Sequence, residues 1–299
     1  MTAIKRTAMS ALRIGYVPEH FSTPLFFAQQ QGFYEKNGVK VEFLPYPSGS
    51  GHLIQSLQDN TIDVAVGLTE AFIAGIGKGA DWYKLIGTYV ESPLCWAIST
   101  GKNRAELTNE DDIRGKRIGV SRIGSGSYVM PFVLAYQKGW TDEYKFNILQ
   151  NFKNLRDAVN LKEGLEPTDA FMWEIFTTKK YYTSGEIKNI GRIYTPWPSW
   201  VISASTNAIS SNAKDLAAFT KSVEEGIEYF KNHQDEAVEW ISTNLDYSAE
   251  DARAWLETVT FRKDTSSVDP EVVEKTITIL KSAKVLDNSA DQAEYVVKV

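Results

Sequence analysis

The chain has 299 residues, of which 43% are hydrophobic and 23% are charged, a balance typical of globular proteins. Acidic residues outnumber basic ones by 38 to 32, so the net charge is −6 and the chain lacks the basic surplus of a nucleic-acid-binding protein. The single cysteine, Cys95, excludes an internal disulfide, and no Cys/His cluster has the spacing of a zinc site. At about 150 residues per domain, the length predicts two domains.

The first third of the chain alternates short apolar runs with helical patterns, which predicts βα units in a largely parallel sheet. Strands are predicted over residues 12–17, 39–44, 63–68 and 85–89. Helices are predicted over residues 24–31, 52–58 and 69–76. A Ser-Gly-Ser-Gly loop at 48–51 precedes the second of these helices.

The same alternation begins again after Pro93, which predicts a second α/β half. Strands are predicted over residues 95–99, 116–120, 146–149, 169–173, 187–194 and 200–204. A second Gly-Ser loop, at 124–127, leads into a predicted helix over 128–138. Ligands collect at the carboxyl ends of parallel strands and between domains, so two such halves predict a ligand cleft.

The last hundred residues are predicted to be helical. Their clearest signal is an amphipathic stripe with spacings of 3, 4, 4 and 3, formed by Leu216, Phe219, Val223, Ile227 and Phe230. Helix starts are predicted at Ser248, with Asp251 three residues on, and at Asp269 before Pro270. We expect this tail to pack on the first half.

The expected fold is therefore an α/β protein with two lobes joined by two crossing segments. Residues 1–92 with 199–299 are predicted to form the first lobe, and residues 93–198 the second. Closure of the cleft would bend the chain near 90–95 and 197–202.

Four segments carry a resemblance to a known superfamily: residues 13–43, 63–75, 113–127 and 168–182. The most specific is the opening strand followed by Pro, an aromatic residue and the string AQQQGFYEKNGV. Together they resemble the type II periplasmic-binding-protein superfamily, in the branch of sulfonate, taurine and nitrate receptors of ABC importers and fungal thiamine-pyrimidine synthases. The resemblance spans residues 12–240 and implies two lobes, hinge strands and ligand capture by closure. The resemblance also implies a transporter as a partner.

The synthases of this branch hold pyridoxal phosphate on a lysine, in a Gly-Leu-Lys-x-x-x-His pattern after the third strand. Here Thr69 stands in place of the lysine and Ile73 in place of the histidine. The cysteine-rich string of those enzymes is also missing. Without the amine no Schiff base can form, so this chemistry is judged absent and no cofactor is expected.

Candidate ligand contacts lie in the loops after strands and on the crossing segments. The first half supplies Glu19, His20, Phe21, Thr69, Glu70, Tyr89 and Glu91. The Gly-Ser loops supply Ser48, Ser50, Ser125 and Ser127, and the second half supplies Trp173, Glu174 and Trp197. Trp96 and Trp200 are interpreted instead as buried hinge residues. No metal ligands and no catalytic residues are assigned.

The chemistry of these residues leaves the ligand open. Carboxylates beside aromatic rings favour a small heteroaromatic amine, such as a pyrimidine precursor of thiamine. Helix starts at the two Gly-Ser loops favour a sulfonate, phosphate or carboxylate. A zwitterion would satisfy both.

The preferred interpretation is a solute-binding protein that closes two lobes around one small molecule, with neither a nucleic-acid partner nor membrane insertion. One alternative is an enzyme on the same scaffold, a lyase or hydrolase that uses Glu70 or Glu174. Another is a ligand sensor. Because Thr7, Ser10 and Arg13 interrupt any apolar run of a leader peptide, a cytoplasmic location is expected.

Overall fold

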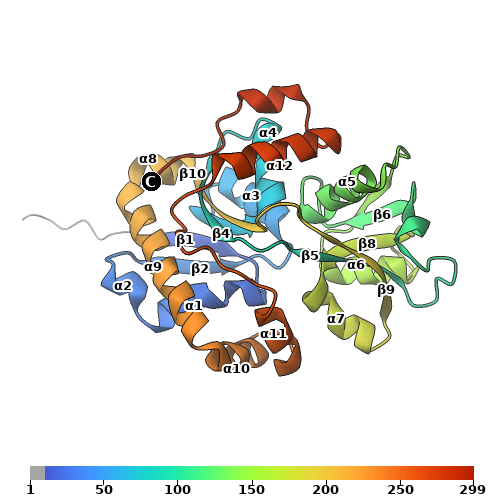
Figure 1. Ribbon diagram of the computed structural model, residues 1–299, viewed down its shortest axis with the longest axis horizontal. Helices are drawn as coiled ribbons and strands as arrows, with labels where there is room; N and C mark the ends of the chain where they lie inside the picture. Colours follow the sequence, from blue (N-terminus) through green and yellow to red (C-terminus); the bar gives the residue numbers. More distant parts are fainter. Residues whose placement is uncertain (1–10) are drawn as a thin grey trace, which may run out of the picture.

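Two separate five-stranded sheets lie at the centre of the molecule (Figure 1). The computed structural model describes residues 11–299, so the predicted lack of a leader at residues 1–10 lies outside the described residues. Below, the first lobe means the first sheet with the helices that contact it, and the second lobe means the second sheet with its helices. The division of the chain at residues 93 and 198 stays a prediction.

The first sheet has the order β2-β1-β3-β10-β4. Its strands are β1 (Leu12–Tyr16), β2 (Val41–Pro45), β3 (Val64–Leu68), β4 (Tyr83–Val90) and β10 (Trp200–Ser205). β1 runs parallel to β2 and β3, whereas β10 is antiparallel to both β3 and β4. The carboxyl ends of β1 and β3 therefore meet at one edge of the sheet.

The second sheet repeats this arrangement in the order β7-β6-β8-β5-β9. Its strands are β5 (Cys95–Gly101), β6 (Arg117–Val120), β7 (Lys145–Ile148), β8 (Ala170–Glu174) and β9 (Ile187–Tyr194). Here β5 is the antiparallel strand, between β8 and β9. The predicted α/β architecture is confirmed, but each sheet is mixed, because each receives one strand from a segment that has crossed over from the other lobe.

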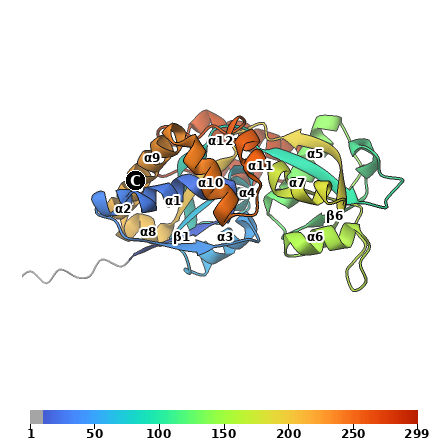
Figure 2. The same ribbon diagram turned by 90° about the horizontal axis from the view of Figure 1, so that it is seen from below.

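Two crossing segments join the lobes, one from β4 to β5 and one from β9 to β10. They are hydrogen-bonded to each other: Thr195 N–H donates to the Leu94 carbonyl at 3.0 Å, and Leu94 N–H donates to Thr195 Oγ1 at 2.9 Å. Figures 1 and 2 show the two bodies side by side, with these segments between them.

Helices pack against both sheets. In the first lobe they are α1 (Thr23–Gln30), α2 (Phe33–Lys36), α3 (Ser50–Gln58) and α4 (Thr69–Gly77). In the second lobe they are α5 (Gly126–Lys138), α6 (Phe152–Val159) and α7 (Ile175–Thr183). The tail contributes α8 (Thr206–Ser211), α9 (Ala213–Asn232), α10 (Gln234–Asn244), α11 (Ala249–Leu256) and α12 (Pro270–Ser282). Three short 3₁₀ turns complete the set: η1 (His20–Ser22), η2 (Glu110–Ile113) and η3 (Asn288–Gln292).

The helical tail packs on the first lobe, as predicted. α9 lies along α1 and α2, and α12 contacts α4. The predicted stripe on α9 is fully buried, and a Cβ added at Gly226 of this helix would lie 2.4 Å from the Pro24 carbonyl oxygen of α1. The predicted caps form as well: Ser248 accepts from the Asp251 N–H, and Asp269 accepts from the Glu271 N–H.

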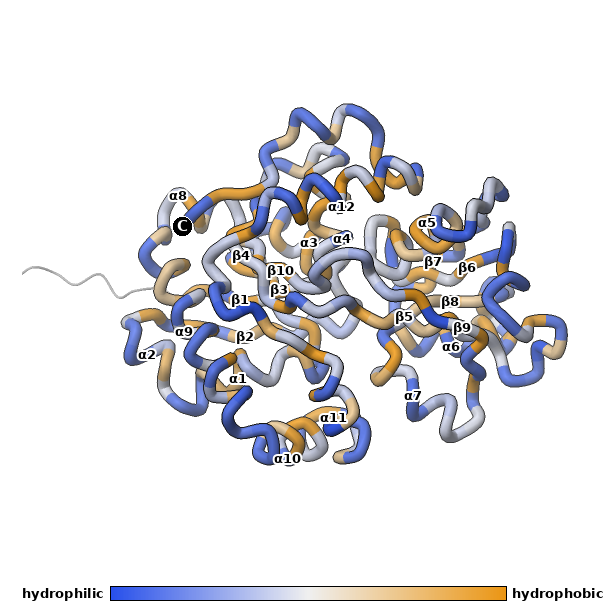
Figure 3. Tube along the Cα trace, viewed as in Figure 1, coloured by the Kyte–Doolittle hydropathy of each residue, from blue (hydrophilic) through white to orange (hydrophobic). Residues whose placement is uncertain are grey.

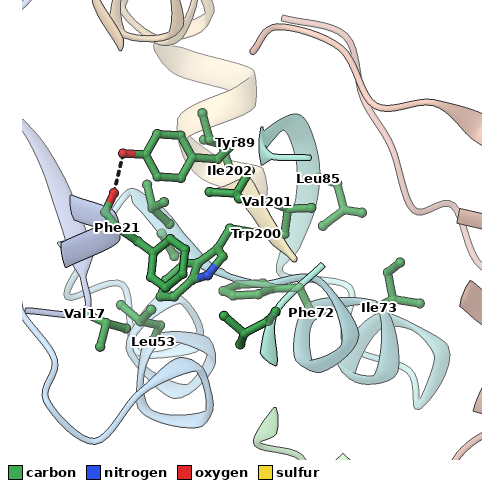
Figure 4. Close-up of a cluster of buried hydrophobic side chains, with 14 of the residues drawn as sticks. Val17, Phe21, Leu53, Phe72, Ile73, Leu85, Tyr89, Trp200, Val201 and Ile202 are labelled. Carbon is green, nitrogen blue, oxygen red and sulfur yellow. Dashed lines mark hydrogen bonds between the residues drawn. The ribbon is translucent and has the colours of Figure 1, made fainter. Parts of the chain in front are cut away.

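The core of the first lobe contains two of the predicted ligand contacts. Phe21 and Tyr89 are buried there, and Tyr89 Oη donates to the Phe21 carbonyl at 2.7 Å (Figure 4). Figure 3 shows hydrophobic segments in both lobes, interspersed with hydrophilic ones. None of the helices within residues 11–299 combines the length and apolar character needed to span a bilayer.

Candidate functional site

A cavity lies between the two sheets, where the strand ends of both lobes face each other. Its cavity volume, the space open to the centre of a water-sized sphere, is about 30 Å³. Three aliphatic side chains, Val17, Leu68 and Leu94, form part of its wall. The rest is built from three kinds of residue: two carboxyls, three tryptophans and a set of serines, together with the backbones of Gly49 and Gly126. We call this space the inner cavity.

The two carboxyls come from opposite lobes. Glu19 follows β1 at its carboxyl end, and Glu174 is the last residue of β8 and the N-cap of α7. Glu174 accepts a hydrogen bond from the Thr177 N–H at 2.7 Å, which fixes its carboxyl at the helix start. Both side chains are buried, with relative exposures of 8% and 5%.

Burial shifts the protonation of both carboxyls. It raises the pKa of Glu19 to about 8, helped by the nearby charge of Glu174 and opposed by a hydrogen bond from Trp173. Burial also raises the pKa of Glu174 to about 7, although the hydrogen bond from the Thr177 N–H acts to lower it. Since two like charges in one buried site disfavour each other, the pair holds a proton at neutral pH.

His20 lies behind this pair, outside the inner cavity. Its fully buried ring is stacked between Tyr247 and Trp255, with centroid separations of 4.4 and 4.3 Å. Its Nε2 is 3.7 Å from Glu174 Oε2, and neither ring nitrogen has a hydrogen-bond partner. Burial lowers the pKa of His20, so the ring is neutral and supplies no compensating charge to Glu174.

Three indole rings line the inner cavity: Trp96 on β5, Trp173 on β8 and Trp200 on β10. Only Trp173 was predicted as a ligand contact. Trp96 and Trp200 are buried, as predicted for hinge residues, yet they also form part of the cavity wall. The indole N–H groups of these two residues are buried without a hydrogen-bond partner.

Five serines from the two Gly-Ser loops and the end of β6 also line the inner cavity: Ser48, Ser50, Ser121, Ser125 and Ser127. Most of their hydroxyls already serve the fold. Ser50 Oγ accepts from the Leu68 N–H at 2.9 Å, and Ser125 Oγ donates to the Arg122 carbonyl at 2.8 Å and contacts Ser127 Oγ at 2.8 Å. The loops precede helices as predicted, and Ser125 caps α5.

Three further predicted contacts, Thr69, Glu70 and Trp197, meet at the returning crossing segment. Thr69 Oγ1 donates to the Pro198 carbonyl at 2.5 Å. The Glu70 carboxyl is completely buried, with Oε2 accepting from Trp197 Nε1 at 2.9 Å and Oε1 without a partner. Burial raises the pKa of Glu70 to about 7. These residues stabilise the crossing segment against α4 and do not line the inner cavity.

The remaining predicted contacts also lie elsewhere. Phe21 and Tyr89 belong to the core described above, and Glu91 forms an ion pair with Arg262 at 2.5 Å near the surface. Of the fourteen predicted residues, the structure brings seven together around the inner cavity: Glu19, Ser48, Ser50, Ser125, Ser127, Trp173 and Glu174. Whether these residues bind a ligand stays a prediction.

Charge at the inner cavity comes only from acids. Among the described residues, no lysine or arginine lines it. No cluster of three or more His, Cys, Asp or Glu side chains in residues 11–299 could hold a metal ion. The arrangement therefore offers a pair of carboxyls and flat aromatic rings to a small molecule.

Comparison with known proteins gives a consistent assignment of the fold. A family model described as Ca3427-like PBP matches residues 96–193, and one described as an NMT1-like family matches residues 6–108. No curated protein sequence matches the chain significantly.

Solved structures match along almost the whole chain. The Candida albicans CA3427 gene product, described as defining a new family with the generic periplasmic-binding-protein fold, is 51% identical over 97% of both chains, with a TM-score of 0.93. The alkanesulfonate-binding protein SsuA from Xanthomonas axonopodis pv. citri is 15% identical over 97% of this chain and all of that one, with a TM-score of 0.77. The nitrate-binding protein NrtA from Synechocystis PCC 6803 is 14% identical over 95% and 84%, with a TM-score of 0.67. The last two establish the fold alone.

Proposed function

Because the chain belongs to the family defined by the Candida albicans CA3427 gene product, which has the periplasmic-binding-protein fold, we propose that it is a binding protein that closes two lobes around one small molecule. We further propose that this molecule is a heteroaromatic amine of the aminopyrimidine type. Structural neighbours named as alkanesulfonate- and nitrate-binding proteins support the first part, since they use this fold for binding.

The observation that carries the second part is the buried pair of Glu19 and Glu174 beside three indole rings. An aminopyrimidine edge has an amino group that donates and a ring nitrogen that accepts. A carboxyl pair with one proton offers the matching acceptor and donor. The flat ring would stack on the indole rings that line the inner cavity.

A wholly anionic ligand fits this cavity less well. Sulfonate or nitrate would face two carboxyls without a lysine or arginine among the lining residues in the described chain. The serine hydroxyls that could bind an anion are largely engaged in hydrogen bonds within the fold. The charge balance therefore supports the amine rather than the anion.

The protonation of the pair gives the proposal a definite pH dependence. Glu174 is ionised above a pKa of about 7, and Glu19 is protonated below a pKa of about 8. The singly protonated pair is therefore most populated between these values. Affinity for a neutral aminopyrimidine should be greatest between about pH 7 and 8 and should fall on either side.

The test uses native mass spectrometry of freshly purified protein, followed by isothermal titration with 4-aminopyrimidine from pH 6 to 9. We expect a retained basic heterocycle, a bell-shaped affinity profile, and at least a tenfold loss of affinity in Glu19→Gln and Glu174→Gln. Glu163→Gln, at an exposed loop carboxyl, is the matched control. Binding of taurine or nitrate in place of 4-aminopyrimidine would refute the amine assignment.

The same variants address the enzymatic alternative. If the protein transforms a small molecule, Glu174→Gln should lower the rate more than it lowers affinity. If the protein only binds, affinity alone should change and the recovered ligand should be chemically unaltered.

A further inference from the structure

A second pocket opens on the outer side of Trp173, towards solvent. We propose that this outer pocket is a second subsite, which holds an uncharged aromatic group carried by the same ligand as the ring in the inner cavity. The inference rests on the proposed function, and it adds that the ligand is larger than one ring.

The outer pocket adjoins the inner cavity. Val17, Glu19 and Trp173 line both, so these three residues stand between the two spaces. The outer pocket has a cavity volume of about 270 Å³, which is enough for a second ring. A substituent on a ring in the inner cavity would reach the outer pocket by passing these residues.

Stacked side chains hold the wall of the outer pocket rigid. Phe152 stacks on Trp173, with ring centroids 4.9 Å apart and planes at 19°, and it meets Tyr181 edge-on at 5.4 Å. The Arg156 guanidinium lies 3.6 Å from the Tyr181 ring centroid and 4.8 Å from that of Phe152. Arg156 is itself buried and is oriented by Glu186 at 2.8 Å. Such a fixed aromatic surface suits a flat group, because little side-chain entropy is lost on binding.

The opposite wall comes from the tail of the chain. Tyr247, between α10 and α11, lines the outer pocket, and its hydroxyl is 2.7 Å from Thr177 Oγ1 on α7. Lys180 on α7 forms an ion pair with Asp246 beside it. The outer pocket therefore has walls from both lobes, and it forms only when they approach each other. A group bound there would bridge the lobes and favour closure.

The charges at the rim argue for an uncharged group. Lys180 and Asp246 neutralise each other. The Lys180 ammonium also lies 4.8 Å from the Tyr181 ring centroid. The other lining side chains, apart from Glu19, are aromatic rings, prolines, a valine and a threonine. An aromatic substituent would pack against the apolar side chains of this wall without displacing the ion pair.

The test compares two probes by isothermal titration: 4-aminopyrimidine and 5-benzyl-4-aminopyrimidine. We expect the benzyl compound to bind about tenfold more tightly to the wild type, the scale of one additional aromatic stacking contact plus its burial. Phe152→Leu and Tyr181→Leu should abolish that advantage and leave the affinity for 4-aminopyrimidine within about twofold. Tyr136→Ala, at an exposed aromatic on α5, is the control.

Equal affinity for the two probes, or equal losses for both in Phe152→Leu, would overturn the second subsite and leave the proposed function standing. If neither pyrimidine binds, the proposed function fails. The second subsite is then tested separately, by titrating the protein with indole. Indole should then shift the Trp173 side-chain N–H resonance in wild-type protein but not in Phe152→Leu. An unshifted Trp173 resonance would overturn the subsite.

Discussion

Replacing Glu19 with glutamine should stabilise the ligand-free protein at pH 8 and change little at pH 5. Burial and the neighbouring Glu174 raise the pKa of Glu19 from 4.5 to about 8. Between these values the folded chain keeps a proton that the unfolded chain has released. The free energy of unfolding of the wild type therefore falls as the pH rises through this window, and the uncharged glutamine does not share the loss.

The size of the effect follows from the two pKa values. Each pKa unit corresponds to 1.36 kcal/mol, so the wild type should lose about 3–4 kcal/mol between pH 5 and pH 8 relative to Glu19→Gln. For a chain of this length, 1 kcal/mol moves the melting temperature by roughly 2 °C. The difference in melting temperature between variant and wild type should thus widen by about 7 °C.

The assay is differential scanning calorimetry of dialysed protein at pH 5, 6, 7 and 8, with wild type, Glu19→Gln and the control Glu163→Gln. Taking differences between variants at each pH removes the contribution of all other titrating groups. A gap that stays constant across the four pH values would show that Glu19 is already ionised in the folded protein. The reasoning about the carboxyl pair would then be wrong.

Three further changes test the packing that shapes the site. A methyl group on Gly126 would lie 2.6 Å from the Leu68 side chain and 2.9 Å from the Trp96 ring, so Gly126→Ala should cost about 1–3 kcal/mol in urea unfolding. Gly51→Ala, whose added methyl would have its nearest neighbours at 3.4 Å, should not. Gly226→Ala would push a methyl group to 2.4 Å from a carbonyl oxygen of α1 and should cost about 1–3 kcal/mol in urea unfolding, despite the better helix propensity of alanine. Trp197→Phe removes the donor to Glu70 and should cost about 1–3 kcal/mol. That loss should grow above pH 7, where the carboxyl is ionised, and a pH-independent loss would contradict it.

The elements of this fold could be read from local sequence patterns. A buried strand is a short continuous apolar run and an amphipathic helix repeats every 3.6 residues, so Val64–Leu68 and the stripe on α9 could be recognised without tertiary contacts. Capping residues mark helix starts for the same local reason, as Ser248 and Asp269 do. The acids and aromatic rings at strand ends likewise indicated a cleft and its general chemistry.

The membership of the site depended on contacts between distant segments. Glu19 and Glu70 both follow strands of the first sheet, and no local signal separates them. The returning crossing segment places Trp197 over Glu70, whereas Glu19 stays open to the inner cavity. The tail covers His20 with Tyr247 and Trp255 from more than two hundred residues away.

Trp96 and Trp200 also show that the residues of the site could not be predicted from local sequence. Apolar composition predicted their burial, but a buried ring has more than one face, and strand pairing decided that part of each would border the inner cavity. The sequence by itself thus determined the strands, the helices and the kinds of side chain at the cleft. Which of those side chains meet there was decided by the tertiary structure, because hydrogen bonds and packing between segments far apart in the chain select the neighbours of each strand end.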